Sequence, residues 1–216
     1  MDSIKAVILD MDGTMIDTEK IYLIYWIKAA NYYGYDMKPE HVLSIRSLAS
    51  KYACKRFKEF FGEECDYFKI REKRKEMMKV YFEEHGIEKK PGLDDFLEYA
   101  KGIGCKIAVA TATDIERTKM YLEKLTIDKY FDEIVCANMV ENGKPEPDIY
   151  IEAAKRLGFN ANECLAIEDA PNGVLSAYRA GCKVIMIPDL SEPDEEISKY
   201  LYAREDSLFD VKKHLK

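Results

Sequence analysis

The residues best suited to chemistry form an acidic pentapeptide, DMDGT at positions 10–14, directly after the apolar run AVIL at positions 6–9. Two carboxylates two positions apart at the end of a strand can share one cation and face one substrate. One such carboxylate can act as a nucleophile and its neighbour as a general acid or base. Gly13 lets the backbone turn sharply behind them. Taken alone, the pentapeptide also fits a strand that ends in an Asx-type turn.

Two polar segments later in the chain could bind a phosphate. Thr111, Ala112 and Thr113 follow an apolar run, and a hydroxyl with neighbouring backbone N–H groups there could hold a phosphate oxygen. Lys144 lies in the loop GKPEPD, where prolines on either side of one residue restrict the backbone and can aim an ammonium group into a site. Each segment has a plainer alternative, a threonine that caps a helix or a surface lysine before a proline-started helix.

A second acidic pair, Glu168 and Asp169, follows another apolar run. Together with Asp10 and Asp12, these acids would form a set of hard oxygen ligands, the type that Mg²⁺ prefers. The alternative for Asp169 is a cap at the start of the next helix. We therefore expect a magnesium site, provided that the fold brings the two acidic pairs together.

The apolar runs and helical patterns predict how these residues are positioned. Short continuous apolar runs indicate strands buried on both faces, as in a parallel sheet, and helical patterns between them indicate a doubly wound α/β fold. In such sheets ligands bind beyond the carboxyl ends of the strands, where all the polar clusters fall. The expected strands are 4–9, 107–110, 164–167 and 184–187, and the expected helices are 93–101, 115–125, 147–157 and 173–180.

The first expected strand is not followed by an ordinary short crossover. Residues 15–90 intervene, and their apolar spacing predicts several helices, punctuated by Pro39, Gly62 and Gly86. We predict a catalytic core made of residues 1–14 and 91–216, and an inserted helical cap made of residues 15–90. The cap would exclude water and hold the leaving group.

Composition excludes several classes of protein. Forty acidic against 33 basic residues give a net charge of -7, which argues against nucleic-acid binding. The six cysteines form no C-x-x-C pair, so a zinc site is not expected and a reducing cytoplasm fits best. Neither a signal peptide at residues 1–3 nor a membrane-spanning stretch is apparent. We expect a cytoplasmic monomer whose partner is a small molecule, not a membrane.

In this order and at this spread, the four motifs resemble the haloacid dehalogenase superfamily. The resemblance is carried by D-x-D-G-T, the threonine after the second strand, G-K-P-x-P-D and E-D-x-x-x-G, and it covers the whole chain. The resemblance is strongest to the branch that contains β-phosphoglucomutase-like enzymes and sugar-phosphate phosphatases, which carry a small helical cap after the first strand. It implies a Rossmann-like core and phosphoryl-transfer chemistry with Mg²⁺.

The resemblance also implies a role for each motif residue. Asp10 would attack phosphorus and form an aspartyl phosphate, and Asp12 would protonate the leaving oxygen and then activate the water. The metal would be held by Asp10, by the backbone carbonyl of Asp12, and by the second acidic pair. The phosphoryl group would be bound by the segment that starts at Thr111 and by Lys144, which would also offset the carboxylate charge.

Residues that contact the rest of the substrate are expected in the cap. The candidates are Tyr22, Arg46, Lys51 and Lys79. Lys79 lies about where mutase-like relatives carry a phosphate-binding lysine. Two departures from the mutases stand out: Tyr22 replaces their histidine after the first motif, and the usual cap element G-x-x-x-R is missing, with residues 44–47 in its region.

The leading hypothesis is a Mg²⁺-dependent phosphatase that acts on a small phosphorylated metabolite, such as a sugar or polyol phosphate. The first alternative is a phosphomutase that resembles β-phosphoglucomutase. A receiver module that stores phosphate on an aspartate uses similar residues, but the insert at residues 15–90 argues against it. A carbon–halogen hydrolase is disfavoured by Asp12, because that chemistry needs no second acid.

Overall fold

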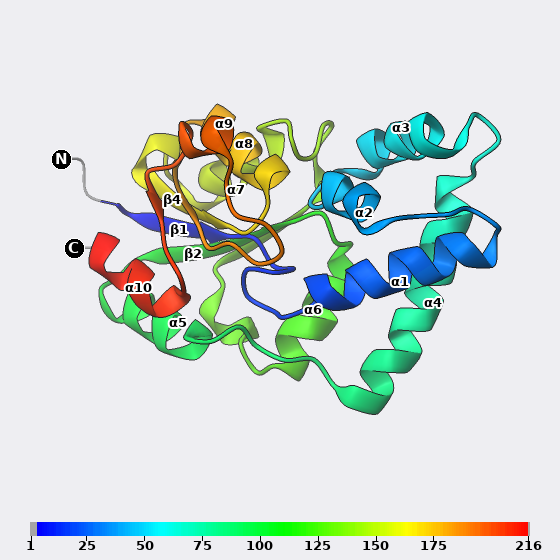
Figure 1. Ribbon diagram of the computed structural model, residues 1–216. Coiled ribbons are helices and arrows are strands. Elements are labelled where there is room, and N and C mark those ends of the chain that lie inside the picture. The colour runs from blue at the N-terminus through cyan, green and yellow to red at the C-terminus, as the bar shows by residue number, and fades with distance from the viewer. Residues whose placement is uncertain (1–3, 216) are drawn as a thin grey trace.

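A single parallel sheet forms the centre of the protein (Figure 1). The computed structural model describes residues 4–215, so residues 1–3 and 216, part of the predicted core, lie outside the described region. Within residues 4–215 the sheet is six-stranded, with the order β3-β2-β1-β4-β5-β6. The strands are β1 (Ala6–Leu9), β2 (Lys106–Thr111), β3 (Glu133–Cys136), β4 (Cys164–Glu168), β5 (Lys183–Met186) and β6 (Ala203–Arg204). The predicted doubly wound α/β fold is confirmed.

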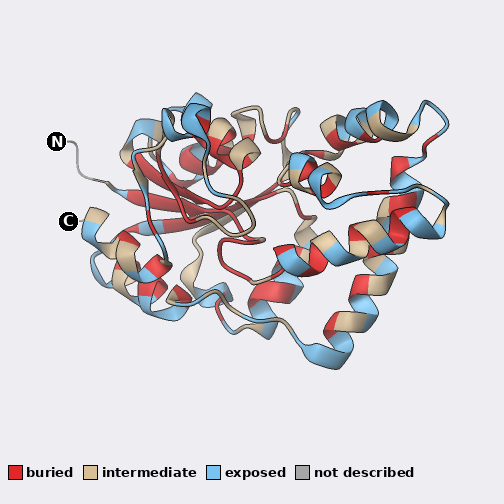
Figure 2. Ribbon diagram, in the orientation of Figure 1, coloured by how far each residue is buried: buried red, intermediate tan, exposed pale blue. Residues whose placement is uncertain are grey.

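Helices cover both faces of the sheet, which explains why its central strands are apolar throughout. Alternate residues of β1 point into two different clusters, Val7 and Leu9 into one, and Ala6 and Ile8 into the other. The first face is covered by α5 (Leu93–Gly102), α6 (Ile115–Lys124) and α10 (Leu208–Val211), and the second by α7 (Asp148–Leu157), α8 (Pro171–Ala180) and α9 (Glu195–Ser198). Figure 2 shows the resulting three layers, with the strands buried between the helices.

The predicted strands and core helices all appear, within a few residues of their expected ends. Strands β3 and β6 were not expected from the sequence. β3 is four residues long and only its last two are fully covered, and β6 has two residues at the far edge of the sheet. Short edge strands lack the continuous apolar run that marks a strand buried on both faces.

A helical insert follows β1 and lies at the carboxyl end of the sheet, away from the two chain ends (Figure 1). Aromatic rings pack between its helices: the centre of the Trp26 ring lies 5.2 Å from that of Phe57 and 5.7 Å from that of Tyr67. None of the helices in residues 4–215 is both long and apolar enough to cross a membrane. The helical insert consists of α1 (Glu19–Tyr32), α2 (Pro39–Ile45), α3 (Ser50–Phe61) and α4 (Tyr67–His85).

The chain enters and leaves the helical insert at one place. Ile16 pairs with Lys89 in an antiparallel bridge. On either side of it, the Asp17 N–H donates to the Glu88 carbonyl at 2.9 Å, and the Lys90 N–H donates to the Met15 carbonyl at 2.8 Å. The two connections therefore form a short paired ribbon between the sheet and the insert.

Candidate active site

The candidate site lies where β1, β2 and β4 end. In the parallel register, Leu9 of β1 is level with Val109 of β2 and Ile167 of β4. The residues that follow in each strand, among them Asp10 and Glu168, therefore meet at one edge of the sheet. The fold thus explains why motifs more than 150 residues apart can act together.

Lys144 joins the two acidic motifs. Its ammonium donates to Asp10 Oδ1 at 2.5 Å and to Glu168 Oε1 at 2.6 Å, and its side chain is fully buried. The loop before α7 positions it, with Pro147 just before the helix begins. Burial opposes the charge on Lys144, but the two carboxylates outweigh this effect and raise the pKa of the ammonium.

A second donor holds Glu168 from the far side. The Tyr150 hydroxyl, on α7, donates to Glu168 Oε1 at 2.5 Å, so both known donors use the same oxygen. Gly173 of α8 makes room for this carboxylate, because a Cβ at that position would lie 2.1 Å from it. Tyr150 was not singled out from the sequence, although it lies only six positions after Lys144.

The acids leave a place for a cation. Ligand oxygens of Asp10, Glu168 and Asp169 lie within 4.8 Å of one another. Asp10 Oδ2 and Glu168 Oε2 are buried and accept no hydrogen bond from residues 4–215. A buried carboxylate oxygen without a partner is costly, and an oxygen-only set suits Mg²⁺. These residues therefore fit the predicted metal.

Without a bound cation, two of these acids, Asp10 and Asp169, resist ionisation. Burial raises the pKa of Asp10 well above its usual range; Lys144 opposes this shift, and the Glu168 carboxylate adds to it. Burial also raises the pKa of Asp169, with Arg46 opposing. The site therefore needs more positive charge than Lys144 and Arg46 supply before all its carboxylates can be anions.

Asp12 is held in a defined orientation over the same pocket. Its two carboxylate oxygens accept hydrogen bonds from the Thr18 and Thr113 hydroxyls, each at 2.7 Å. Gly13, with φ of +87°, provides the turn that separates Asp12 from α1. A Cβ on Gly13 would lie 2.3 Å from Asp169 Oδ2, so the position requires glycine for space as well as for conformation.

The segment after β2 forms another wall of the pocket. Thr111, Ala112 and Thr113 all line it together with Asp10 and Asp12. The Thr113 N–H donates to Thr111 Oγ1 at 3.0 Å, which closes a tight turn at the end of the strand. The predicted phosphate-binding segment and the predicted nucleophile therefore share one cavity.

The helical insert closes this cavity through the loop between α2 and α3. In this loop, the Ala49 N–H donates to the Lys144 carbonyl at 2.9 Å, and the Arg46 carbonyl accepts a hydrogen bond from the Asn172 side chain, also at 2.9 Å. The space left for water-sized spheres is about 80 Å³. That is room for only a few waters, so the structure has the insert closed on the core.

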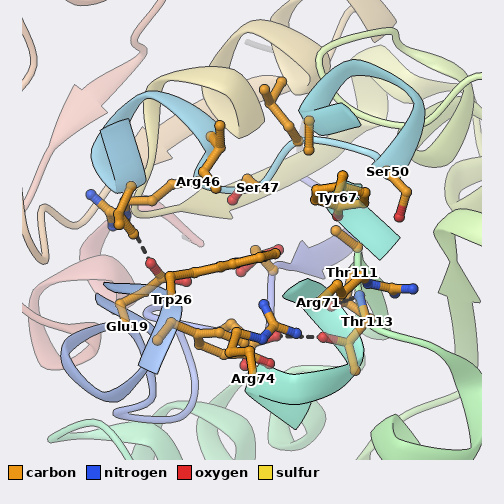
Figure 3. A pocket seen from close by; sticks show the side chains of 18 of the residues that line it. Glu19, Trp26, Arg46, Ser47, Ser50, Tyr67, Arg71, Arg74, Thr111 and Thr113 are labelled. Carbon is orange, nitrogen blue, oxygen red and sulfur yellow. Dashed lines mark hydrogen bonds and ion pairs between the residues drawn. The ribbon is translucent and has the colours of Figure 1, made fainter. Parts of the chain in front are cut away.

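Arg46 crosses from the insert to the acidic site. Its guanidinium donates to Glu19 at 3.0 Å, to Ser191 at 3.1 Å, and to the Asp169 carboxylate. Figure 3 shows the bond to Glu19 at one side of the pocket. Burial raises the pKa of Glu19 to about 8; Arg46 opposes this, and Asp12 and Asp10 add to it. Glu19 was not recognised from the sequence, where it is one acid among many at a helix start.

The other insert candidates separate into two groups. Tyr22 is buried and lines the pocket with Asp10. Lys51 and Lys79 line a neighbouring groove instead, and the Lys79 side chain is 77% exposed, with Glu83 at 3.8 Å. The structure therefore does not bring Lys79 to the cavity where the acids meet.

Comparisons with known proteins agree with this geometry. The sequence profile of the haloacid dehalogenase-like hydrolases matches residues 7–187. A phosphorylated carbohydrates phosphatase of Thermotoga maritima is 30% identical over 181 residues, 84% of this chain and 83% of that protein. Hexitol phosphatase A of Escherichia coli is 31% identical over 198 residues, 88% of each protein. CbbY of Rhodobacter sphaeroides, solved with phosphate, superposes with a TM-score of 0.79 at 26% identity over 96% of each chain.

Fold and site together define a phosphoric monoester hydrolase with a Rossmann-like core. The chain belongs to the haloacid dehalogenase-like hydrolases, in their sugar-phosphate phosphatase branch. The predicted family and enzyme class are confirmed, and the receiver-module alternative is set aside.

Proposed function

We propose that this enzyme hydrolyses the phosphate monoester of a small sugar or polyol, with Asp10 as nucleophile and Mg²⁺ as cofactor. The observation that carries the proposal is the state of the Asp10 carboxylate. One of its oxygens is held by Lys144, and the other is buried in the pocket wall without a hydrogen-bond partner among residues 4–215. Because Lys144 fixes this carboxylate, one of its oxygens could contact the cation while the other attacks phosphorus.

Asp10 and Asp12 have different surroundings, which suits different roles. Asp10 would form the aspartyl phosphate, and the Thr18 and Thr113 hydroxyls would keep Asp12 beside the leaving oxygen. Asp12 would give its proton to that oxygen and later take one from the attacking water. The covalent step divides one displacement into two easier ones.

The remaining groups would hold the phosphoryl oxygens and balance charge. Phosphoryl transfer depends chiefly on positioning and on stabilising the charge spread over these oxygens. Lys144 and the turn that begins at Thr111 would bind them. Bound Mg²⁺, held by Asp10, Glu168 and Asp169, would neutralise the acids and polarise the phosphate.

The substrate class rests on the relatives, which include named phosphatases of phosphorylated carbohydrates and of hexitol phosphates. The closed insert supports a small leaving group, because the cavity has little room. Activity of this kind is expected on a small metabolite in the cytoplasm.

The test is a screen of sugar and polyol phosphates, with p-nitrophenyl phosphate as a general substrate. We expect multiple turnover with Mg²⁺, none after chelation by EDTA, and a loss of about a thousandfold or more in Asp10→Asn. Asp36→Asn, at an exposed position of the helical insert, is the matched control. Full activity of Asp10→Asn would refute the assignment of the nucleophile.

The same screen separates phosphatase from mutase. With β-glucose 1-phosphate as substrate, a phosphatase releases inorganic phosphate, whereas a mutase gives glucose 6-phosphate as its main product. The phosphatase proposal fails if glucose 6-phosphate predominates.

A further inference from the structure

Arg74, on α4, is a buried cation that makes no ion pair within residues 4–215. The residue is only 6% exposed. Its guanidinium carbon lies 4.3 Å from the ring centre of Trp26 and 4.6 Å from that of Tyr22. Its Nε is buried without a hydrogen-bond partner, and no carboxylate of residues 4–215 forms an ion pair with it.

A fold does not gain stability from such a group. Removing a guanidinium from water carries a large penalty, which an ion pair normally repays and which aromatic faces repay only in part. Burial lowers the pKa of Arg74, and the neighbouring charges of Arg117 and Arg71 lower it further, while Tyr22 opposes. The position is therefore explained better by a ligand than by packing.

Two more arginines line the same cavity. Arg117 of α6 pairs with Asp114 at 3.0 Å, yet its Nε is buried and has no hydrogen-bond partner in the described part of the chain. Arg71 lies one turn before Arg74 on α4, and its nearest carboxylate, that of Glu72, is 3.9 Å away. Figure 3 shows Arg71 and Arg74 beside Thr113, across the pocket from the bond between Arg46 and Glu19.

Besides the acids Asp10 and Asp12, the lining of the cavity thus contains a group of three arginines. We infer that the natural substrate carries a second anionic group, a carboxylate or another phosphate, which Arg74 binds with help from Arg71 and Arg117. This inference rests on the proposed function and narrows its substrate class. A guanidinium that packs against aromatic rings and makes no ion pair keeps N–H groups that can bind an oxyanion in bidentate fashion. Sugar hydroxyls alone would leave the charge unpaired.

Matched substrate pairs test the inference. The carboxylate arm compares 3-phosphoglycerate with glycerol 3-phosphate and 6-phosphogluconate with glucose 6-phosphate. The phosphate arm compares fructose 1,6-bisphosphate with fructose 1-phosphate. We expect the member with two anionic groups in at least one pair to have a kcat/KM about tenfold or more higher, as a charged hydrogen bond supplies. The arm with the preference identifies the second group.

Substitutions test which residues cause the preference for a second anionic group. In Arg74→Met we expect the preference to fall to near unity, because kcat/KM should fall more for the member with two anionic groups than for its partner. Arg56→Met removes an exposed arginine of the helical insert and should leave the preference intact. Arg71→Gln, at a partly exposed position, should weaken the preference as well. This variant still tests the inference if Arg74→Met folds poorly.

Stability provides a second readout that a packing role would not produce. Without substrate, Arg74→Met should keep or raise the Tm, since it removes an unpaired buried charge. Equal kcat/KM within every pair, or a lower Tm in Arg74→Met with the preference retained, would overturn the inference. Failure of the wild type to hydrolyse any phosphate ester, including p-nitrophenyl phosphate, would instead refute the proposed function.

Discussion

At the scale of single residues, the site is organised by which carboxylate oxygens are occupied. Asp12 accepts a hydroxyl hydrogen bond on each of its oxygens, whereas Asp10 and Glu168 each keep one oxygen without a partner in residues 4–215. The donors that create this pattern are Lys144 and Tyr150. A tyrosine hydroxyl that holds one oxygen of a metal ligand leaves the other oriented for the cation.

Tyr150→Phe removes this hydrogen bond without changing the ring. We expect the Mg²⁺ concentration for half-maximal activity to rise about tenfold or more, the usual cost of losing a group that orients a ligand. The folded state should also lose about 1 kcal/mol. Titration of activity with Mg²⁺ measures the first effect, and Tyr178→Phe, at an exposed position of α8, is the control. An unchanged titration would show that Lys144 alone orients Glu168.

At the scale of elements, the sequence predicted what continuous apolar runs can reveal. Strands β1, β2, β4 and β5 are buried on both faces, and their sequences show the continuous apolar runs expected of such strands. Polar residues that follow these runs mark the site. Strand β3 was missed because it is short and half-covered at the sheet edge.

The side of each insert helix that faces the site could not be predicted. Arg74 and Lys79 are both basic residues of α4, but they are five positions apart and so about 140° apart around the helix. Packing against α1 and the core decides that Arg74 faces the cavity and Lys79 the neighbouring groove. Periodicity shows that a helix has faces, not which neighbour each face meets.

The helical insert and the Lys144 loop are in such close contact that one added methyl group should disturb them. A Cβ on Gly143 would lie 2.8 Å from the Ala49 Cβ. We expect Gly143→Ala to lower kcat/KM roughly tenfold, because a small displacement of the closing loop misplaces groups over the substrate.

A compensating change distinguishes this contact from a local effect on Lys144. Ala49→Gly in the Gly143→Ala background removes the opposing methyl group and should restore kcat/KM to within about threefold of the wild type. Gly102→Ala, where a Cβ would meet nothing within 4 Å, is the control. A double variant no better than Gly143→Ala would contradict the predicted contact.

At the scale of the whole molecule, buried acids couple stability to pH and to metal. Glu19 ionises near 4.5 when unfolded and near 8 in the folded protein, so between these values the unfolded chain binds fewer protons. The free energy of unfolding is therefore highest while Glu19 is neutral, and it falls as the pH rises through this window. The raised pKa values of Asp10 and Asp169 act in the same direction.

Thermal unfolding of the metal-free protein in EDTA should show this effect. We expect the Tm to fall from pH 5 to pH 8, with Glu19 alone contributing a slope of at most about 1.4 kcal/mol per pH unit. Glu19→Gln should flatten the slope, and Mg²⁺ should raise the Tm most at pH 8, because it binds the ionised acids of the folded state. Parallel slopes for wild type and Glu19→Gln would show that Glu19 ionises normally.

The paired ribbon that joins sheet and insert has a consequence for how such a molecule can change. The chain leaves the core at Met15 and returns at Lys90, and a hydrogen bond joins these two residues. The two ends of the insert are therefore close together in space. The sheet would keep its connectivity if a tight turn bridged that gap. Substitutions on the cavity-facing side of α4 would therefore change the residues that meet the substrate without changing how the strands that hold the acids are connected.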